Sequence, residues 1–559
     1  MPHPARYILA GLIALALAVF LLWPVLEVIQ EPFTGAEGPL YWFGRFFANS
    51  VRRAWLFNAL KLAATTTVLT ALLALPLALL ADRYAFPGKS LATALLMAPM
   101  ILPPFVGALA VEKILSLNNG SVNLVLTRLG LGQVNFLSGP GTFWVVVGLE
   151  VLHLYPILFL NATAALANID PAMAEAARNL GASRWRVFAR ITLPLMRPGL
   201  FAGATLVFIW SFCEIGTPLM VGYLDVLPVK AYDYLRQLEA GPSTYVMVFV
   251  LLSTSVGLYA LGRWLFGRSA GAMAARAGGA RTQRRLGGMG CVLCWLAFLA
   301  VTLLAGLPHA GVVLMSISRQ WSATILPTAY TLDHLAEVFR DRRTWNAIAN
   351  SLRYAGLSTG LCAAIGLSIA YLVVRLRVRG AAALDALSML SLAVPGLVLA
   401  AGYVAITRPG SALEAIGPWR NPTLLLVVAY TVRRLPYMVR SVSAGLEQTS
   451  ETLEEAARNL GASRLRTVLR ITVPLILANI LAGGLLTFSF NMLEVSDSLV
   501  LAQTAQHYPI TKQIFELVGL AESRNLAAAL GVYAMGLLGL TIAAANVLLG
   551  RRMGQLFRV

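Results

Sequence analysis

Apolar runs of about 20 residues recur along the chain, and each is long enough to cross roughly 30 Å of hydrocarbon as a helix. Only 12% of the 559 residues are charged and 58% are hydrophobic, whereas a soluble domain usually carries about 25% charged residues. This balance excludes an ordinary soluble enzyme and a disordered chain. The run length excludes a β-barrel, whose strands read as about 10 alternating residues.

We therefore expect an all-α polytopic membrane protein with twelve transmembrane helices. The predicted spans are 7–29, 55–81, 91–115, 142–167, 196–221, 244–265, 290–317, 346–373, 384–407, 422–444, 476–502 and 526–549.

The basic residues gather on one predicted side of the membrane. When both termini are placed on the same side, 27 of the 44 Lys and Arg residues lie in or close to the loops of that side, against 8 of the 25 acidic residues. The positive-inside rule makes this side, and both termini, cytoplasmic. Because the basic residues are dispersed among the spans, nucleic-acid binding is not expected.

The four cysteines all fall in or at apolar spans. Cys291 and Cys294 form a C-x-x-C pair, but no second pair or histidine cluster completes a zinc site. We interpret all four as small packing residues and expect no metal site.

A 21-residue segment occurs twice, at an offset of 280 residues. EAARNLGASRWRVFARITLPL begins at Glu175 and EAARNLGASRLRTVLRITVPL begins at Glu455, and 16 of the 21 positions are identical. The same register aligns Glu214 with Glu494. We predict two homologous six-span halves, 1–265 and 290–559, joined by a Gly-, Ala- and Arg-rich cytoplasmic linker at 266–289. Six spans per half make the repeats parallel, related by an axis along the membrane normal.

Each repeated segment lies between the fourth and fifth spans of its half and predicts a helix–turn–helix, at about 170–190 and 450–470. Asp170 is a good N-cap, Gly181 suits the left-handed C-terminal position, and Ser183 can cap a second helix. In the second copy, Thr449 or Ser450 can cap the first helix. A loop helix that merely packs on its own spans is the alternative, but two near-identical exposed loops in diverged halves indicate two copies of one docking partner.

These residues resemble the EAA motif of the permeases of ATP-binding-cassette (ABC) importers, and the resemblance covers the whole chain. The chain is similar to the fused, two-half permeases of the ferric iron and thiamine branch. Val473 stands where the motif has Leu, an apolar exchange. The matching residues are Glu175, Ala176, Ala177, Gly181 and Ile191–Pro194 in the first copy, and Glu455, Ala456, Ala457, Gly461 and Ile471–Pro474 in the second.

The resemblance implies the partners and the location. Each motif would form a coupling helix seated on one subunit of a homodimeric ABC ATPase at the cytoplasmic face of a prokaryotic plasma (inner) membrane. The chain itself lacks the G-x-x-x-x-G-K-[ST] phosphate loop. We therefore expect this chain to be no enzyme and to bind no cofactor, with ATP and Mg²⁺ on the partner. An extracytoplasmic binding protein would deliver the ligand to outward loops at 30–54, 222–243, 319–345 and 503–525. The interface between the halves would then open alternately to the outside and to the cytoplasm.

Ionisable residues inside predicted spans are the candidate translocation pathway, because such residues are costly in a membrane. The functional interpretation is that they line the route of the ligand. The alternative is that they pair with one another, for example Glu150 with Arg433 or Arg434, and only fix the packing. The candidates are Glu150, His153, Glu214, Arg433, Glu494 and Asp497.

The ligand is predicted as ferric iron or an iron complex, because SFCEIGTPLMVG in the fifth span resembles a stretch of ferric iron permeases. The second half departs from this stretch at EVSDSLVLA. Thiamine, a phosphonate or sugar phosphate, and a polyamine stay open as ligands. An ion-coupled secondary transporter is the alternative class.

Overall fold

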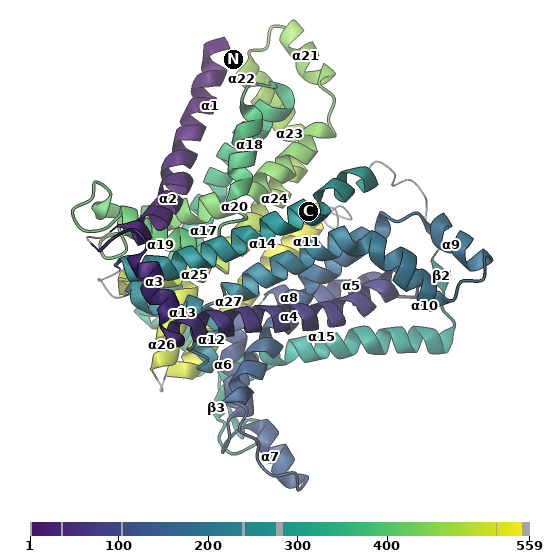
Figure 1. The fold of residues 1–559 in the computed structure, drawn as a ribbon, viewed down its shortest axis with the longest axis vertical. Coiled ribbons are helices and arrows are strands. Elements are labelled where there is room, and N and C mark those ends of the chain that lie inside the picture. Colours follow the sequence, from purple (N-terminus) through teal and green to yellow (C-terminus); the bar gives the residue numbers. More distant parts are fainter. Residues whose placement is uncertain are drawn as a thin grey trace. The chain divides into compact units, whose positions relative to one another are not determined.

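The computed structural model describes residues 3–34, 37–101, 104–236, 241–274, 283–520 and 523–549. Most of them are helical, as expected where lipid offers the backbone no hydrogen-bond partners. The chain forms two compact units (Figure 1). Unit 1 comprises Met1–Arg53, Lys230–Leu252 and Leu332–Leu556, and unit 2 comprises Ala54–Val229 and Ser253–Thr331.

In its described part, the regular elements of unit 1 are all helices. Its elements are α1 (His3–Leu17), η1 (Ala18–Leu22), α2 (Trp23–Gln30), η2 (Glu31–Phe33), α3 (Tyr41–Ala48), most of α13 (Leu227–Arg236), the start of α14 (Pro242–Ala274), α16 (Asp333–Arg340), α17 (Arg342–Ala370), η5 (Tyr371–Arg375), α18 (Ala381–Leu390), α19 (Gly396–Ile406), η6 (Glu414–Ile416), α20 (Thr423–Glu447), α21 (Thr452–Asn459), α22 (Arg464–Thr467), η7 (Val468–Thr472), α23 (Val473–Leu475), α24 (Leu477–Met492), α25 (Ser496–Leu501), η8 (Ala505–His507), α26 (Ile510–Gly519) and α27 (Arg524–Leu549).

Unit 2 adds two small sheets to its helices. Parallel β1 and β2 pair Tyr84 with Arg284 and Ala85 with Arg285, and antiparallel β3 and β4 pair Ser318 with Tyr330. The elements are most of α4 (Ser50–Arg83), β1 (Tyr84–Ala85), α5 (Lys89–Met97), η3 (Ala98–Ile101), α6 (Pro104–Leu115), α7 (Ser121–Arg128), α8 (Pro140–Ala167), α9 (Pro171–Asn179), α10 (Arg184–Val187), η4 (Phe188–Thr192), α11 (Leu193–Phe212), α12 (Gly216–Val221), the rest of α14, β2 (Arg284–Arg285), α15 (Gly288–Ser316), β3 (Ser318–Gln320) and β4 (Ala329–Tyr330).

The all-α membrane architecture is confirmed, but the count of twelve spans is not. Among the described residues, seven helices are long and apolar enough to cross a membrane, or up to nine when each of two bent pairs counts as one span. Several predicted continuous spans are broken: 91–115 into α5, η3 and α6, 384–407 into α18 and α19, 196–221 between α11 and α12, and 476–502 between α24 and α25. Proline explains part of this, since Pro99 lies in η3 and Pro395 immediately precedes α19.

The two compact units do not follow the two sequence halves. The predicted first span of the first half, α1 to α2, packs in unit 1, where Ile13 and Leu17 join the core of Ile369 and Leu372. There α2 approaches α19 so closely that a Cβ at Gly402 would collide with the Pro24 carbonyl. The first span of the second half, α15, packs in unit 2. The predicted halves 1–265 and 290–559 therefore follow the sequence repeat, and their boundaries differ from those of the compact units. Part of the predicted linker 266–289, residues 275–282, lies outside the described residues.

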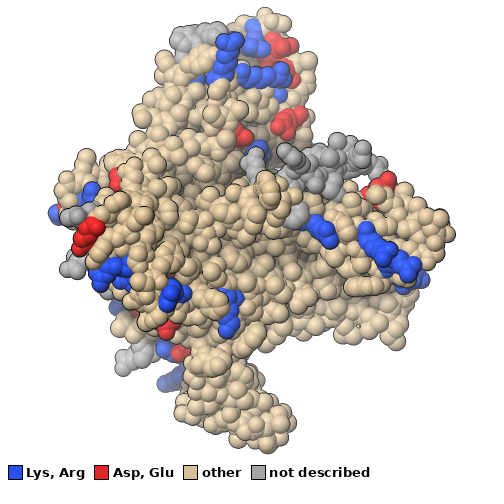
Figure 2. Space-filling model, in the orientation of Figure 1, with Lys and Arg blue, Asp and Glu red and all other residues tan. Residues whose placement is uncertain are grey.

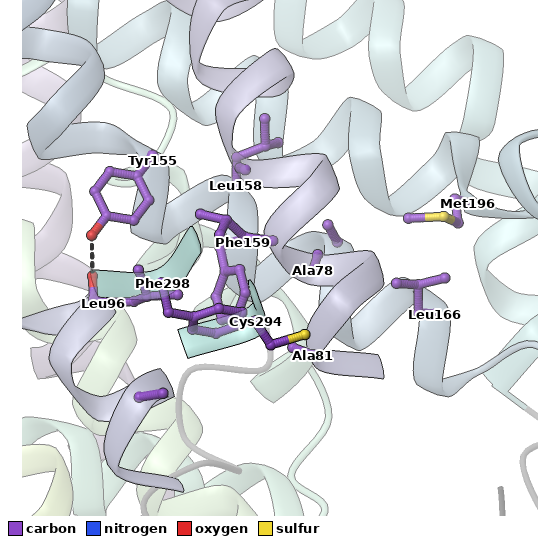
Figure 3. Close-up of a cluster of buried hydrophobic side chains, with 14 of the residues drawn as sticks. Ala78, Ala81, Leu96, Tyr155, Leu158, Phe159, Leu166, Met196, Cys294 and Phe298 are labelled. Atoms are coloured by element: carbon purple, nitrogen blue, oxygen red, sulfur yellow. Dashed lines mark hydrogen bonds between the residues drawn. The ribbon is translucent and has the colours of Figure 1, made fainter. Parts of the chain in front are cut away.

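The core of unit 2 shows how α15 is held (Figure 3). Cys294 and Phe298 of α15 lie buried among Ala81 of α4 and Phe159 of α8. The Tyr155 hydroxyl donates a hydrogen bond to the Leu96 carbonyl at 2.7 Å. Cys294 is buried in this core, as expected for a packing residue, whereas Cys291 is only partly buried.

Candidate functional site

The first repeated segment folds as its local chemistry predicts. The Asp170 carboxylate accepts a hydrogen bond from the Ala172 amide at 2.9 Å and starts α9. The helix ends at Gly181, whose φ of +83° suits glycine, and the Ala182 amide donates back to the Ala177 carbonyl at 3.0 Å. The Ser183 hydroxyl then accepts from the Arg186 amide and starts α10. The predicted helix–turn–helix is therefore observed.

The second copy keeps this geometry at the turn and in the second helix, but α21 starts one position later than α9, with Glu451 at its N-cap position. The Ser450 hydroxyl accepts from the Thr452 amide at 3.2 Å, as Asp170 does in the first copy. Gly461 has a φ of +87°, and Ser463 caps α22 through the Arg466 amide. Each segment continues into a π-helical turn, η4 or η7. Turns of this kind are rare in proteins and occur often at functional sites.

The two segments, which we call coupling segment 1 (α9–α10) and coupling segment 2 (α21–α22), expose the same set of side chains. Glu175 and Glu455 are exposed, and so are Ala176 and Ala456. Ala177 is only half-buried and Ala457 is buried, so these two predicted contact residues face largely inward. A Cβ built on Gly181 or Gly461 would have no atom within 4 Å. Glycine is therefore favoured at both positions by the positive φ and not by a lack of space.

Large apolar side chains complete this exposed surface, and most of them were not singled out from the sequence. Leu180 and Leu460 are each 89% exposed. Four others are exposed at matching positions: Met173 and Leu453, and Trp185 and Leu465. Large apolar residues at equal positions in two polar segments are a signal that could have found them, since exposed apolar patches mark protein contact sites.

In the view of Figure 1, α9 and α10 lie at one end of unit 2, and α21 and α22 lie at one end of unit 1. Figure 2 shows Lys and Arg side chains on the surface over both segments. The exposed basic residues there are Arg178, Arg184, Arg186 and Arg190 in the first copy, and Arg458, Arg464, Arg466 and Arg470 in the second. Each segment thus offers a partner exposed leucine and glutamate with basic residues around them.

The two copies differ in how they are attached. In coupling segment 2, the buried Glu454 carboxylate accepts from Arg375 Nε at 3.0 Å and from the Tyr371 hydroxyl at 3.1 Å. Arg375 also donates to the carbonyl and the hydroxyl of Thr449 at 2.8 and 2.7 Å. We call this set of four residues the Arg375 clamp.

Coupling segment 1 has apolar residues where the clamp would be. The repeat offset aligns Glu454 with Ala174 and Thr449 with Ile169, and both first-copy residues are buried. Arg83 matches Arg375, since each stands five residues before a positive-φ glycine, Gly88 or Gly380, that precedes the next helix. Unlike Arg375, whose side chain is 6% exposed, Arg83 is an exposed residue.

Three of the predicted pathway residues meet in unit 1. Arg433, on α20, contacts Glu494 and lies 3.1 Å from Asp497. The neighbouring Arg434 contacts Glu494 at 2.5 Å and lies over the Phe490 ring. Two arginines therefore face two buried carboxyl groups.

The other predicted pathway residues lie in unit 2. Glu150, on α8, accepts hydrogen bonds from the hydroxyls of Thr66 and Ser211, and His153 lies one turn further along the same helix. The suggested pair of Glu150 with Arg433 or Arg434 would join the two units and stays a prediction. Within unit 1, pairing is observed, while lining of a pathway remains a prediction for all six residues.

The repeated glutamate has a structural role that the sequence did not reveal. Glu214 lies in the break between α11 and α12, and its carboxylate accepts from the Thr217 amide at 3.2 Å. Glu494 lies in the equivalent break and accepts from the Asp497 amide at 3.4 Å. A carboxylate at a helix N-terminus is stabilised by the free amides and the helix dipole. Both glutamates thus start a short helix inside a broken span.

The fold and the site together define the class of this protein. A polytopic helical protein with two equivalent exposed coupling segments belongs to the transport permeases. The model of the family described as "Binding-protein-dependent transport system inner membrane component" matches residues 42–270 and 362–555, and the chain belongs to this family. The two matches correspond to the two halves of the repeat. The protein is thus a fused, two-half, multi-pass inner-membrane permease of an ABC importer of type I.

Relatives named for ferric iron match most of the chain. It is 27% identical over 511 residues to the putative ferric transport system permease protein FbpB 1 of Haemophilus influenzae, covering 89% of this chain and 78% of the relative. It is also 27% identical to the ferric transport system permease protein FbpB of Actinobacillus pleuropneumoniae, covering 92% and 74%. The molybdenum transport system permease protein ModB of Escherichia coli is 34% identical over 163 residues, covering 28% of this chain and 70% of the relative. A crystal structure of a bacterial ABC transporter that imports the polysaccharide alginate matches with a TM-score of 0.40 at 19% identity, covering 47% of this chain and 96% of that chain.

Proposed function

We propose that this permease imports ferric iron or an iron complex that an extracytoplasmic binding protein delivers. The supporting observation is that two relatives named for ferric transport align over about nine-tenths of the chain. The molybdenum relatives align over less than half of this chain, although the alignments cover 90%, 92% and 70% of those relatives. Glu214 to Pro218 also keep the residues that resemble ferric iron permeases.

The two coupling segments would dock a separate ABC ATPase, one subunit to each segment, on the cytoplasmic side. The observation that carries this part is the equal exposure of Leu180 and Leu460, together with Glu175 and Glu455, in two segments that share the same glycine turn and the same serine cap on the second helix. In each segment the exposed leucine is accompanied by two further exposed apolar side chains at matching positions, and grouped exposed apolar side chains mark protein contact sites. ATP and Mg²⁺ would be bound and hydrolysed on that partner.

The helices give a route for the movement inside each unit. In unit 2 a single apolar stretch, Arg184–Phe212, runs from α10 through η4 and α11 and ends at the break that holds Glu214. A displacement of coupling segment 1 would therefore reach Glu214 along one continuous helical stretch, a rigid element of the kind that coupling uses. In unit 1 the equivalent route bends by 74° between Arg464–Leu475 and Leu477–Met492 before it reaches Glu494, so the movement there would pass through this bend.

Docking is tested by charge reversal on the exposed glutamates. Glu175→Lys with Glu455→Lys should release the ATPase from the purified complex, because both docking surfaces lose their carboxylate at once. Glu447→Lys is the matched control, since Glu447 is also exposed, lies just before coupling segment 2 and carries the same charge. An ATPase that stays bound to the double variant at full stoichiometry would count against the docking proposal.

The ligand is tested in vesicles that contain the permease and its ATPase, with the binding protein supplied outside. ATP-dependent uptake of radioactive ferric iron, and not of molybdate or thiamine, is the expected result. Uptake of molybdate alone would overturn the iron assignment and leave the docking proposal intact. Uptake driven by an ion gradient in vesicles without the ATPase would favour a secondary transporter instead.

A further inference from the structure

A groove of about 410 Å³ opens beside the first turns of α15, in unit 2. Its volume lies in the range of about 300–1,000 Å³ that small-molecule sites occupy. The lining carries no charged side chain, and consists of Pro87, Cys291, Val292, Trp295, Leu296 and Leu299. Val292, Leu296 and Leu299 are 52%, 56% and 40% exposed, whereas Cys294 and Phe298 on the other side of the helix are buried in the core. The groove is thus an apolar hollow on the outer face of a candidate membrane span, Gly288–Ser316.

Trp295 forms a fixed wall of this groove. Its indole N–H donates a hydrogen bond to the Pro87 carbonyl at 3.0 Å, and its ring packs edge-on against Phe86. The ring lies directly over Gly88, where a Cβ would come within 2.7 Å of it. Because these contacts hold the indole in place, the hollow is preformed. Tryptophan bound in this way is typical of the level where hydrocarbon meets headgroups.

Basic residues lie next to one end of the groove. The β1–β2 pairing places Arg284 and Arg285 beside Tyr84 and Ala85, two to three residues before Pro87. Both arginines are exposed, and Leu286, which follows them, accepts a hydrogen bond at its carbonyl from the Cys291 thiol. Arg83 is exposed at the same turn, and the Lys89 ammonium donates to the Tyr84 carbonyl. Four basic residues thus lie in or beside this turn, and Asp82 lies close to one of them, Lys89.

We propose that this place binds an anionic phospholipid, with an acyl chain in the groove and the phosphate at Arg284 and Arg285. An apolar hollow that ends at a cluster of cations has the shape and charge of such a lipid, and basic pockets beside spans bind acidic headgroups. A soluble phosphate would use the arginines but would gain nothing from the six apolar lining residues. The lipid would hold the β2 end of the linker against the α4–α5 turn.

Binding is measured on the complete permease in detergent, with phosphatidylglycerol and phosphatidylcholine that carry the same acyl chains. Native mass spectrometry counts retained lipid, and the thermal midpoint is followed as each lipid is added. Phosphatidylglycerol should bind more tightly and raise the midpoint more. Glycerol phosphate without acyl chains should have no effect on the midpoint.

Two variants divide the site into its parts. Arg284→Gln with Arg285→Gln should weaken phosphatidylglycerol binding by about tenfold or more and leave phosphatidylcholine unchanged, because each basic residue near a membrane surface adds to the attraction. Arg340→Gln with Arg342→Gln removes the same charge from two other exposed positions and should change neither lipid. Trp295→Ala should weaken both lipids, because the wall of the groove is lost.

Equal affinity for the two lipids would overturn the proposal, and so would equal losses in the two arginine double variants. An effect of glycerol phosphate as large as that of the whole lipid would show an anion site that does not use the groove, and this result would also overturn it. None of these results depends on which ligand the permease imports.

Discussion

Coupling segments 1 and 2 share nearly the same outward surface but are held to the protein by different chemistry. Leu180 and Leu460 are equally exposed, and Gly181 and Gly461 turn the chain in the same way. Inward, coupling segment 1 rests on apolar Ala174 and Ile169, whereas coupling segment 2 is tied by the Arg375 clamp. If both segments dock the same partner, as proposed, their outward residues are held alike by that partner, whereas their inward residues contact only their own helices and could diverge.

The largest effect is expected when the shared surface is changed on both sides. Leu180→Asp with Leu460→Asp should lower the affinity for the ATPase by roughly 1,000-fold, because we expect each leucine to act as an interface hot spot that contributes about 2 kcal/mol. Binding of the ATPase to the purified permease measures this. The two single variants, Leu180→Asp and Leu460→Asp, should lose affinity by similar amounts. Leu224→Asp, which changes another exposed leucine, is the control. A loss confined to one of the two single variants would break the equivalence of the segments.

The next effect should separate the two segments. Arg375→Met leaves the Glu454 carboxylate buried without its cation, which typically costs about 3–5 kcal/mol. Hydrogen exchange should then become faster in coupling segment 2 and stay unchanged in coupling segment 1. Arg83→Met, at the matching exposed position, should change stability by no more than about 0.5 kcal/mol.

A second change should restore most of this loss. Adding Glu454→Leu to Arg375→Met replaces the buried ion pair with apolar groups, and such replacements are often neutral. If the double variant exchanges as fast as Arg375→Met alone, then the loss does not arise from the unpaired carboxylate, and the clamp has been misinterpreted.

The glycine turns should give a smaller and equal effect. Gly181→Ala and Gly461→Ala each force a residue with a Cβ into the left-handed region, at a cost of roughly 1–2 kcal/mol. Because neither position is crowded, no further loss is expected, and exchange rates of the preceding helix should rise equally in both variants. Unequal effects would show that attachment, and not the turn, governs the stability of each segment.

The smallest effect concerns the outer rim of the clamp. Arg377 and Glu451 form an ion pair at 3.3 Å, but their side chains are 77% and 44% exposed. Exposed pairs contribute about 0–1 kcal/mol and weaken with salt. Arg377→Gln should therefore leave exchange in coupling segment 2 nearly unchanged. A loss as large as that of Arg375→Met would show that the rim, and not the buried pair, attaches the helix.

The sequence predicted well whatever depends on neighbours within a few residues. The caps at Asp170, Ser183 and Ser450 and the turns at Gly181 and Gly461 are all observed, because each is a contact between residues two to five apart. Span continuity was predicted less well. The breaks at Glu214 and Glu494 lie inside apolar runs, where hydropathy stays high while a carboxylate caps a new short helix.

The amino-acid sequence by itself determined the membrane class, the repeat and the coupling segments, because run length, identity at a fixed offset and capping are properties of the chain read in order. The tertiary structure decided which residues far apart in the sequence contact each other. Arg375 meets Glu454 across 79 residues, Arg433 meets Glu494 across 61, and α1 packs on residues near 369. Such contacts form only when folding brings far segments together, and their energy comes from burial and charge pairing that no local pattern records.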